Sequence, residues 1–266
     1  MLTIRKASKT FLKNTPNEHI ALDGVSLKLD AGEFVTVIGS NGAGKSTLFN
    51  AVGGTFLLDS GRVLLNGEDI TYEAEHRRAA VIGRLFQDPA KGTAPDMTIE
   101  ENLALAYNRR GKSGLRRGVH RRDVAVFREQ LSELDMALEN RMKTKVGLLS
   151  GGQRQALSLL MATIGRPLLL LLDEHTAALD PEAAKKIMQI TKNVVARQKL
   201  TTMMITHNIK AALETGTRTI MLDRGKIILD ISGKEREDMT VARLMELFSQ
   251  RGGGALDNDR MLLVKS

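Results

Sequence analysis

Apolar residues occur along this chain in short blocks that are separated by glycines and polar stretches. Residues 33–40, EFVTVIGS, form a run rich in Val and Ile that stops near a glycine, which is typical of a buried strand. A helix is expected directly afterwards, from Lys45 to about Val52. Short strand patterns with a loop at KNTPNEH precede this region, and GRVLLNG predicts a strand after it.

The pattern becomes helical between about residues 98 and 163. The stretches TIEENLALAY, DVAVFREQLSEL and GGQRQALSLLMAT carry apolar residues at spacings of three and four. Strand patterns return in LLLLLD, TTMMIT, TRTIML and KIILD, with helices expected at 181–196 and 208–214. Strands that alternate with helices favour a mostly parallel sheet covered by helices, so the helical stretch is interpreted as an insertion into this α/β fold.

Composition sets limits on what such a chain can be. It has 266 residues, of which 42% are apolar and 26% charged, and these are ordinary values for a soluble protein with a sizeable core. Because it has no cysteine, disulfides and thiolate chemistry are excluded. No apolar run approaches the roughly 18 residues that span a bilayer, and MLTIRKASKTF lacks the apolar core of a secretion signal. We therefore expect a cytoplasmic chain that reaches a membrane only through a partner.

The net charge of +8 favours anionic partners, and the charge is unevenly distributed. Residues 109–122, RRGKSGLRRGVHRR, hold seven Lys or Arg and no acid. Two interpretations remain open for this segment, a solvated basic loop or a contact with lipid headgroups or a membrane partner. Nucleic acid is not expected as a partner, because a chain with 3% aromatic residues and no Trp has few platforms for base stacking.

The first candidate site is the glycine-rich stretch GSNGAGKST at 39–47, which matches the phosphate-binding pattern G-x-x-x-x-G-K-[ST]. Glycines let the backbone N–H groups converge on phosphate oxygens, and the following helix directs its positive end at the same place. A lysine supplies a cation for the β- and γ-phosphates, and the serine hydroxyl is a ligand for Mg²⁺. The loop consists of Gly39, Ser40, Asn41, Gly42, Ala43, Gly44, Lys45, Ser46 and Thr47.

The second candidate site follows the strand Leu168–Leu172, which is apolar at every position, as expected of a strand buried on both faces. Ligands of such sheets bind outside the carboxyl ends of the strands. Asp173 and Glu174 therefore belong at the mouth of a nucleotide site. Asp173 is expected to bind Mg²⁺, and Glu174 to polarise a water molecule aimed at the γ-phosphate.

A third candidate site opens a helix at Ser150, Gly151 and Gly152. A hydroxyl, bare backbone N–H groups and a helix N-terminus together form an anion site. One chain with two sites for a γ-phosphate suggests two chains that share their nucleotides.

The motifs and their order along the chain resemble those of the ATP-binding cassette (ABC) family of transport ATPases, over roughly residues 2–235. Gly39–Thr47 resembles the Walker A loop, and Leu168–Glu174 resembles the Walker B strand. LSGGQ at 149–153 is similar to the family signature, and MTIEENL is typical family sequence. The resemblance implies that Gln153 helps to bind nucleotide.

The resemblance also assigns expected roles to single residues. Phe11 in SKTF resembles the aromatic residue that stacks on adenine, and Gln87 in LFQD resembles the Q-loop glutamine, which contacts Mg²⁺ and the membrane partner. Asp180 in AALD resembles the D-loop aspartate, which signals across a dimer. His207 in ITH resembles the switch histidine, which orients the γ-phosphate and water, and Glu174 would be the general base.

A member of this family would have a P-loop NTPase (RecA-like) core with a mostly parallel sheet, an N-terminal antiparallel β subdomain and an inserted α-helical subdomain. We expect one ABC ATPase domain over 1–240, with 1–87 and 164–240 forming the nucleotide-binding core and 88–163 the helical subdomain that carries the signature. A C-terminal helix and a weakly ordered tail are expected at 241–266.

The family further implies partners and a place of action. Two cassettes, as a homodimer or a pair with a second cassette, close head to tail around two ATP molecules. An integral-membrane permease binds the helical subdomain through a short helix, and an extracytoplasmic solute-binding protein is a further expected partner. The chain would hydrolyse ATP on the inner face of the membrane and power an importer of a small solute such as an amino acid. A soluble ABC ATPase of the cluster-assembly type is the alternative.

One residue departs from the family pattern, because His175 follows the catalytic glutamate where proline is usual. Histidine restores the backbone N–H that proline lacks and adds a group expected to titrate near neutrality. The substitution is interpreted as tolerated, with tuning of Glu174 as the alternative. Metal binding is disfavoured, because no second His or Cys lies nearby at ligand spacing.

Overall fold

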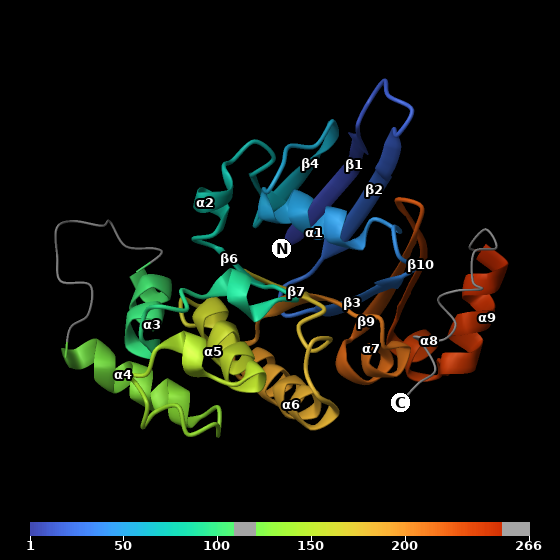
Figure 1. Ribbon diagram of the computed structural model, residues 1–266. Coiled ribbons are helices and arrows are strands. Elements are labelled where there is room, and N and C mark those ends of the chain that lie inside the picture. The colour runs from blue at the N-terminus through green and yellow to red at the C-terminus, as the bar shows by residue number, and fades with distance from the viewer. Residues whose placement is uncertain (109–120, 252–266) are drawn as a thin grey trace. The chain divides into compact units, whose positions relative to one another are not determined.

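The computed structural model describes residues 1–108 and 121–251 (Figure 1). The basic segment 109–122 lies outside the described residues apart from its last two positions, and the tail 252–266 lies outside them entirely. The chain divides into two compact units. Unit 1 comprises Met1–Arg78 and Thr201–Ser266, and unit 2 comprises Ala79–Leu200.

Unit 1 contains an antiparallel sheet with the strand order β2-β1-β4-β5. Its strands are β1 (Leu2–Phe11), β2 (His19–Leu29), β4 (Ser60–Leu65) and β5 (Glu68–Asp69). The register of β1 shifts against both of its neighbours, so this sheet is irregular along its length. The antiparallel N-terminal subdomain expected from the family resemblance is thereby confirmed.

A second group of strands in unit 1 is mostly parallel. It consists of β3 (Phe34–Gly39), β8 (Thr201–Ile205), β9 (Arg218–Asp223) and β10 (Lys226–Ser232). β3 runs parallel to both β8 and β9, and β10 pairs antiparallel with β9 (Figure 1). Every residue of β8 is buried, which explains why its sequence shows no polar alternation.

Unit 1 contains the helices expected at 45–52, at 208–214 and near the C-terminus, and two short helices that were not predicted, 75–78 and 233–237. They are α1 (Lys45–Gly53), α2 (Glu75–Arg78), α7 (Ile209–Thr215), α8 (Gly233–Glu237) and α9 (Val241–Arg251). α9 is amphipathic, and its buried residues Leu244 and Phe248 join one apolar cluster with Ala212 of α7 and Ile231 of β10. The C-terminal helix is therefore part of the core of unit 1.

Unit 2 contains two parallel strands and most of the helical sequence. The elements are β6 (Ile82–Leu85), the 3-10 helix η1 (Pro89–Gly92), α3 (Ile99–Tyr107), α4 (Arg121–Ser132), the 3-10 helix η3 (Val146–Leu148), α5 (Gly151–Thr163), β7 (Leu169–Asp173) and α6 (Pro181–Gln198). β6 and β7 pair in parallel, and the four leucines of β7 have no exposed surface. Among the described residues, no helix combines the length and apolar character that a membrane span requires.

Arg78 connects the end of the α1 helix to the segment that precedes α2. Its side chain is buried, and its guanidinium donates hydrogen bonds to the carbonyls of Ala51 (2.8 Å), Val52 (2.9 Å), Thr71 (2.8 Å) and Glu73 (3.0 Å). The first two carbonyls belong to the last turn of α1, where no intrahelical partner is available. The charge also faces the negative end of the helix dipole, so Arg78 holds α1 in place.

We predict that Arg78→Met lowers the free energy of unfolding by about 3 kcal/mol, because four buried carbonyls lose their donors. Urea denaturation measures the change. Arg62→Met is the matched control, because the Arg62 side chain is 70% exposed and lies 3.6 Å from Asp69. The control is expected to change the free energy by less than about 0.5 kcal/mol. Equal effects of the two substitutions would contradict this role of Arg78.

Candidate functional site

The glycine-rich loop of unit 1 connects the end of β3 to the start of α1, as its sequence predicts. Gly39 and Gly44 have φ angles of +148° and +101°. A Cβ atom at Gly39 would lie 2.2 Å from the carbonyl oxygen of Leu222, and one at Gly44 would lie 2.3 Å from that of Ala21. Both positions therefore require glycine, because neither the backbone angle nor the space admits a side chain.

The loop closes around the ammonium group of Lys45. The side chain is buried, and Nζ donates hydrogen bonds to the carbonyls of Gly39 (2.7 Å) and Ser40 (2.8 Å). Gly44 is the N-cap of α1 and offers no side-chain cap, so the N–H groups of the first turn are directed into the loop. A fixed cation beside the N-terminus of a helix fits a phosphate chain.

The remaining loop residues differ in exposure. Asn41, Gly42 and Ser46 are exposed, Ser40 and Thr47 are half-buried, and Ala43 is buried. Nothing lies within 4 Å of a Cβ atom built at Gly42, so that side of the loop is open to a ligand. The Ser40 hydroxyl donates to Asp223 at the end of β9 (3.4 Å). We did not predict this aspartate, although its strand ends in an acid after an apolar run, as β7 does.

His207 belongs to the same edge of unit 1 as the loop. β3 and β8 are parallel with Val37 opposite Ile205, and the Thr206 N–H donates to the Val37 carbonyl (3.2 Å). His207 follows, and Asn208 then caps α7 by accepting from the Ala211 N–H (2.9 Å). A strand end and a helix start thus hold His207 between them.

Phe11 lies at the end of β1, where its ring is 36% exposed. Phe56 packs edge-on against it with ring centroids 5.4 Å apart, and Lys9 Nζ lies 5.6 Å and 5.2 Å from the Phe11 and Phe56 centroids. Phe56 was not predicted as part of this site, because it lies in a loop 45 positions away in the chain. The pair presents an aromatic edge and a cation at the surface of unit 1.

In unit 2, the two parallel strands bring three of the expected residues to one edge. Leu85 of β6 lies opposite Leu172 of β7, so Gln87 and the acids Asp173 and Glu174 follow adjacent strand ends. Arg84 Nη2 lies 4.0 Å from Asp173 Oδ2, and its guanidinium stacks 4.6 Å from the Phe86 ring centroid. Arg84 therefore places a cation beside Asp173, the expected metal ligand. The sequence analysis did not predict this role for Arg84.

Glu174, the first residue after β7, has an unusual backbone conformation. Its φ of +46° lies in the left-handed region, which is uncommon for residues other than glycine. The Glu174 carbonyl accepts from the Ala177 N–H (2.9 Å), so the chain turns immediately after the strand. This turn determines where the carboxylate lies relative to β7.

His175 does not titrate near neutrality, so that expectation is wrong. The side chain is only 2% exposed, and its burial lowers the pKa of His175 to about 4. The neutral imidazole is favoured because charging it inside the protein would cost solvation energy. The described residues also contain no cluster of three or more His, Cys, Asp or Glu that could bind a metal.

The signature sequence forms the start of α5. The Ser150 side chain accepts from the Gln153 N–H (3.2 Å), and the Gln153 side chain accepts from the Ser150 N–H (3.3 Å), which makes a capping box. Gln153 Nε2 also donates to the Met136 carbonyl (3.4 Å), so this amide is used inside unit 2. The Ser150 hydroxyl acts as an acceptor here and keeps its hydrogen for a ligand.

Asp180 caps the start of α6 by accepting from the Ala183 N–H (2.9 Å), and its side chain is on the surface. α6 starts beside the signature, because a Cβ atom built at Gly152 would lie 3.3 Å from the Cβ of Ala183. Gly151 is exposed and Gly152 is buried. The N-termini of α5 and α6 are therefore neighbours within unit 2.

Each unit carries one of the expected metal ligands, and each ligand is an oxygen donor of the kind that suits Mg²⁺ bound with a nucleotide. Mg²⁺ is usually held by one or two protein oxygens, with phosphates and water completing the coordination. Ser46 at the start of α1 and Asp173 at the end of β7 offer such oxygens. The protein therefore does not need to supply every ligand of the Mg²⁺ ion.

Comparisons with known proteins agree with this geometry. Residues 22–177 match the family model described as ABC transporter. A tyrosine transport ATP-binding protein of Clostridioides difficile is 42% identical over 93% of this chain and 98% of its own length. The methionine import ATP-binding protein MetN of Rhizobium johnstonii is 37% identical over 78% of this chain and 56% of its own length.

Among solved structures, the chain is similar to the dimeric ATP-binding cassette MJ0796 in a post-hydrolysis state bound to ADP and Pi. The TM-score is 0.74 with 30% identity, and the match covers 87% of this chain and 98% of MJ0796. The expected fold, an α/β cassette with an antiparallel β subdomain, is thus confirmed. The chain belongs to the ABC transporter family, in which it is an ATP-binding subunit whose ATPase activity powers transport.

Proposed function

We propose that this cassette hydrolyses MgATP to drive import of an amino acid, with tyrosine or a related aromatic amino acid as the first candidate. The observation that carries the ATPase part is the closure of the glycine-rich loop around Lys45 at the start of α1. The identity to the tyrosine transport protein, which extends over nearly the whole of both chains, supports the choice of amino acid. The identity to the methionine import protein MetN supports import.

The loop binds the phosphates through backbone N–H groups from Gly42 to Thr47, with Lys45 neutralising the β- and γ-phosphates. Ser46 and Asp173 would each supply an oxygen ligand to Mg²⁺, and the metal would offset charge on the phosphate oxygens. Phe11 contacts the adenine base through the face of its ring, while Phe56 supports its edge. Phosphoryl transfer needs mainly positioning, and these groups fix the substrate in place.

Glu174 acts as the general base and accepts a proton from the attacking water. His207 would orient the γ-phosphate and the water, and Gln87 would contact the metal and the membrane partner. The support for these roles is the placement of each residue directly beyond a parallel strand, at the edge where ligands of α/β sheets bind. General-base catalysis of this kind contributes about 10²–10⁴ in rate.

The second half of the ATP site is supplied by another cassette, through Ser150, Gly151 and Gly152. A hydroxyl with an available hydrogen and a helix start with a bare glycine backbone suit the γ-phosphate of a partner-bound ATP. Asp180 lies on the surface next to this helix start and faces the partner chain in our proposal. The dimeric form of the related cassette MJ0796 supports a dimer of cassettes. The proposed dimer is a head-to-tail homodimer or a pair with a second cassette.

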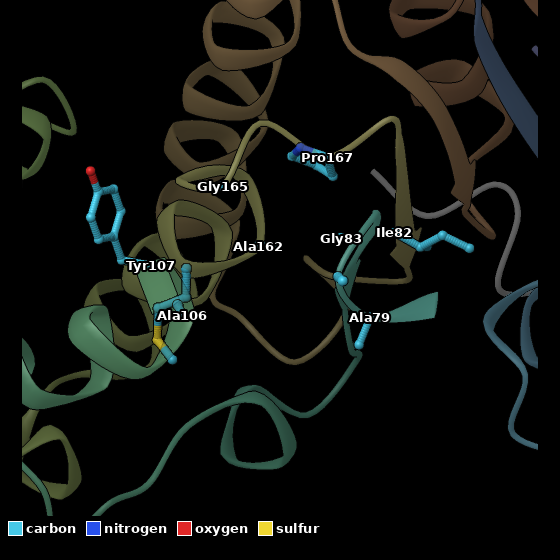
Figure 2. Close-up of a pocket in the computed structure, with 10 residues that line it drawn as sticks. Ala79, Ile82, Gly83, Ala106, Tyr107, Ala162, Gly165 and Pro167 are labelled. Carbon is cyan, nitrogen blue, oxygen red and sulfur yellow. The ribbon is translucent and has the colours of Figure 1, made fainter. Parts of the chain in front are cut away.

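The permease binds at an apolar pocket of unit 2. The pocket is lined by Ala79, Ala80, Ile82, Gly83, Ala106, Tyr107, Met161, Ala162, Gly165 and Pro167 (Figure 2). Most of these residues are small, so they leave room for the side chains of a short helix from the permease. Leu105 and Val126, which are 56% and 38% exposed, extend the apolar surface of the same helical region. Through this contact, the cassette works at the inner face of the membrane.

We predict that Glu174→Gln binds MgATP but loses at least about 10²-fold in turnover, because the amide cannot accept the proton. Gel filtration with MgATP is expected to show an accumulated dimer. Glu182→Gln is the control, since Glu182 is an exposed glutamate in the first turn of α6, and it should keep wild-type turnover. Wild-type turnover in Glu174→Gln would contradict the general-base assignment.

We also predict that Tyr107→Ala weakens co-purification with an integral-membrane partner, because Tyr107 borders the pocket with a ring that is 43% exposed. ATPase activity of the isolated chain should persist. Tyr72→Ala, at an exposed tyrosine of unit 1 outside the pocket, is the control for a general loss of aromatic surface. Recovery of scaffold proteins in place of a membrane protein from the wild-type chain would favour the soluble, non-transport alternative.

A further inference from the structure

His175 and Thr191 form a buried hydrogen bond inside unit 2 that the proposed reaction does not use. His175 Nε2 lies 3.1 Å from Thr191 Oγ1, and the two residues are 2% and 0% exposed. His175 directly follows Glu174, whereas Thr191 belongs to the middle of α6. The contact therefore ties the residue next to the general base to a long helix.

The direction of this hydrogen bond follows from the helix. Thr191 Oγ1 also lies 2.8 Å from the Ile187 carbonyl one turn earlier, and a carbonyl can only accept. The hydroxyl hydrogen is therefore used in the helix, so the oxygen has lone pairs left for His175. His175 must carry its hydrogen on Nε2 and donate it, which assigns the neutral Nε2–H tautomer.

The segment between Glu174 and Asp180 is held to α6 at both of its ends. Its first part is tied by His175 to Thr191, and its last residue caps the helix through the Ala183 N–H (2.9 Å). Between these points, the Ala177 N–H donates to the Glu174 carbonyl (2.9 Å). A substitution at Thr191 therefore acts on this segment from within the helix, without touching any group that contacts nucleotide.

Glu174 needs such support because of its backbone. Its φ of +46° is unfavourable for a residue with a side chain, and such conformations persist where the surrounding structure holds them. The nearest residue with a side chain fixed in the interior is His175. Losing the hydrogen bond would let the peptide between these two residues relax and would move the carboxylate away from the attacking water.

We propose that His175 and Thr191 are a positioning pair that sets the orientation of the Glu174 carboxylate for water activation. The inference rests on the proposed role of Glu174 as general base. It differs from tuning by charge, since the imidazole works here as a neutral donor and an anchor. It also differs from the interpretation that histidine is merely tolerated in place of proline at this position. If it were merely tolerated, loss of the hydrogen bond would leave turnover unchanged.

The test compares Thr191→Val with Thr191→Ser in the full-length chain. Valine has nearly the shape of threonine and removes the acceptor, so kcat for ATP should fall roughly tenfold while KM changes less than about twofold. Serine keeps the hydroxyl and should retain kcat within about threefold of the wild type. His175→Gln keeps an amide N–H near the position of Nε2 and should also retain most of the activity.

Thr163→Val is the matched control for lost stability. Thr163 is also fully buried, and its hydroxyl donates to the Leu159 carbonyl one turn earlier in α5 (2.8 Å). The same hydroxyl is removed in both valine variants, and Thr191→Val also leaves the buried His175 donor unsatisfied, so its melting temperature should fall at least as far as that of Thr163→Val. Only Thr191→Val should lower kcat, measured well below both melting temperatures with the folded fraction determined by circular dichroism.

The outcomes separate the pair from the proposed function. Wild-type kcat in Thr191→Val, or an equal loss in Thr163→Val, overturns the positioning pair and leaves Glu174 as the base if Glu174→Gln is inactive. Should Glu174→Gln retain turnover, the general base itself is wrong. If His175 variants fail to fold, the comparison of valine and serine at Thr191 still decides the question.

Discussion

Parallel pairing between buried strands is the constraint on which the chemistry of this cassette depends. A parallel pair delivers the carboxyl ends of its strands to one edge, so residues that are far apart in the chain become neighbours there. In unit 1, this pairing brings the loop after β3 next to the residues after β8. In unit 2, it brings Gln87 next to Asp173 and Glu174. The complete burial of the β7 leucines keeps that register fixed.

The strand ends become useful through the turns that follow them. After β3 the chain needs glycines, because it must pass close to carbonyls of neighbouring segments and still direct its N–H groups at one point. After β7 the chain turns at a glutamate with positive φ, and two contacts with α6 hold the following segment. Each unit thus pairs a reactive position with a helix that fixes it, α1 in unit 1 and α6 in unit 2.

Local signals explain why much of this site could be predicted from the sequence. The phosphate loop, the acids after the leucine strand and the capped start of α5 are each defined by residues within a few positions of one another. The interactions that were missed join distant segments. Arg78 reaches the end of α1, Phe56 packs on Phe11, and His175 is buried against α6. No pattern of neighbouring residues in the sequence predicts these pairs.

His175 shows the physical limit of the local view most clearly. A histidine next to a catalytic glutamate suggests a group that titrates, since its ordinary pKa is near neutrality. Burial of the ring in the folded chain lowers the pKa of His175 and keeps it neutral, and the ring forms a hydrogen bond with Thr191. Burial of a single side chain in a loop depends on how the helix packs, and that is decided by the tertiary structure.

Site-directed cross-linking tests most directly whether two chains complete the ATP site. The chain contains no cysteine, so Asn41→Cys in one population and Leu148→Cys in another introduce single thiols at the exposed tip of the phosphate loop and just before the signature. With Glu174→Gln in both, a short bismaleimide should join the two kinds of chain in MgATP. We predict a cross-linked dimer that requires nucleotide and both cysteines. A cross-link that forms equally without ATP, or none with it, would contradict a shared site.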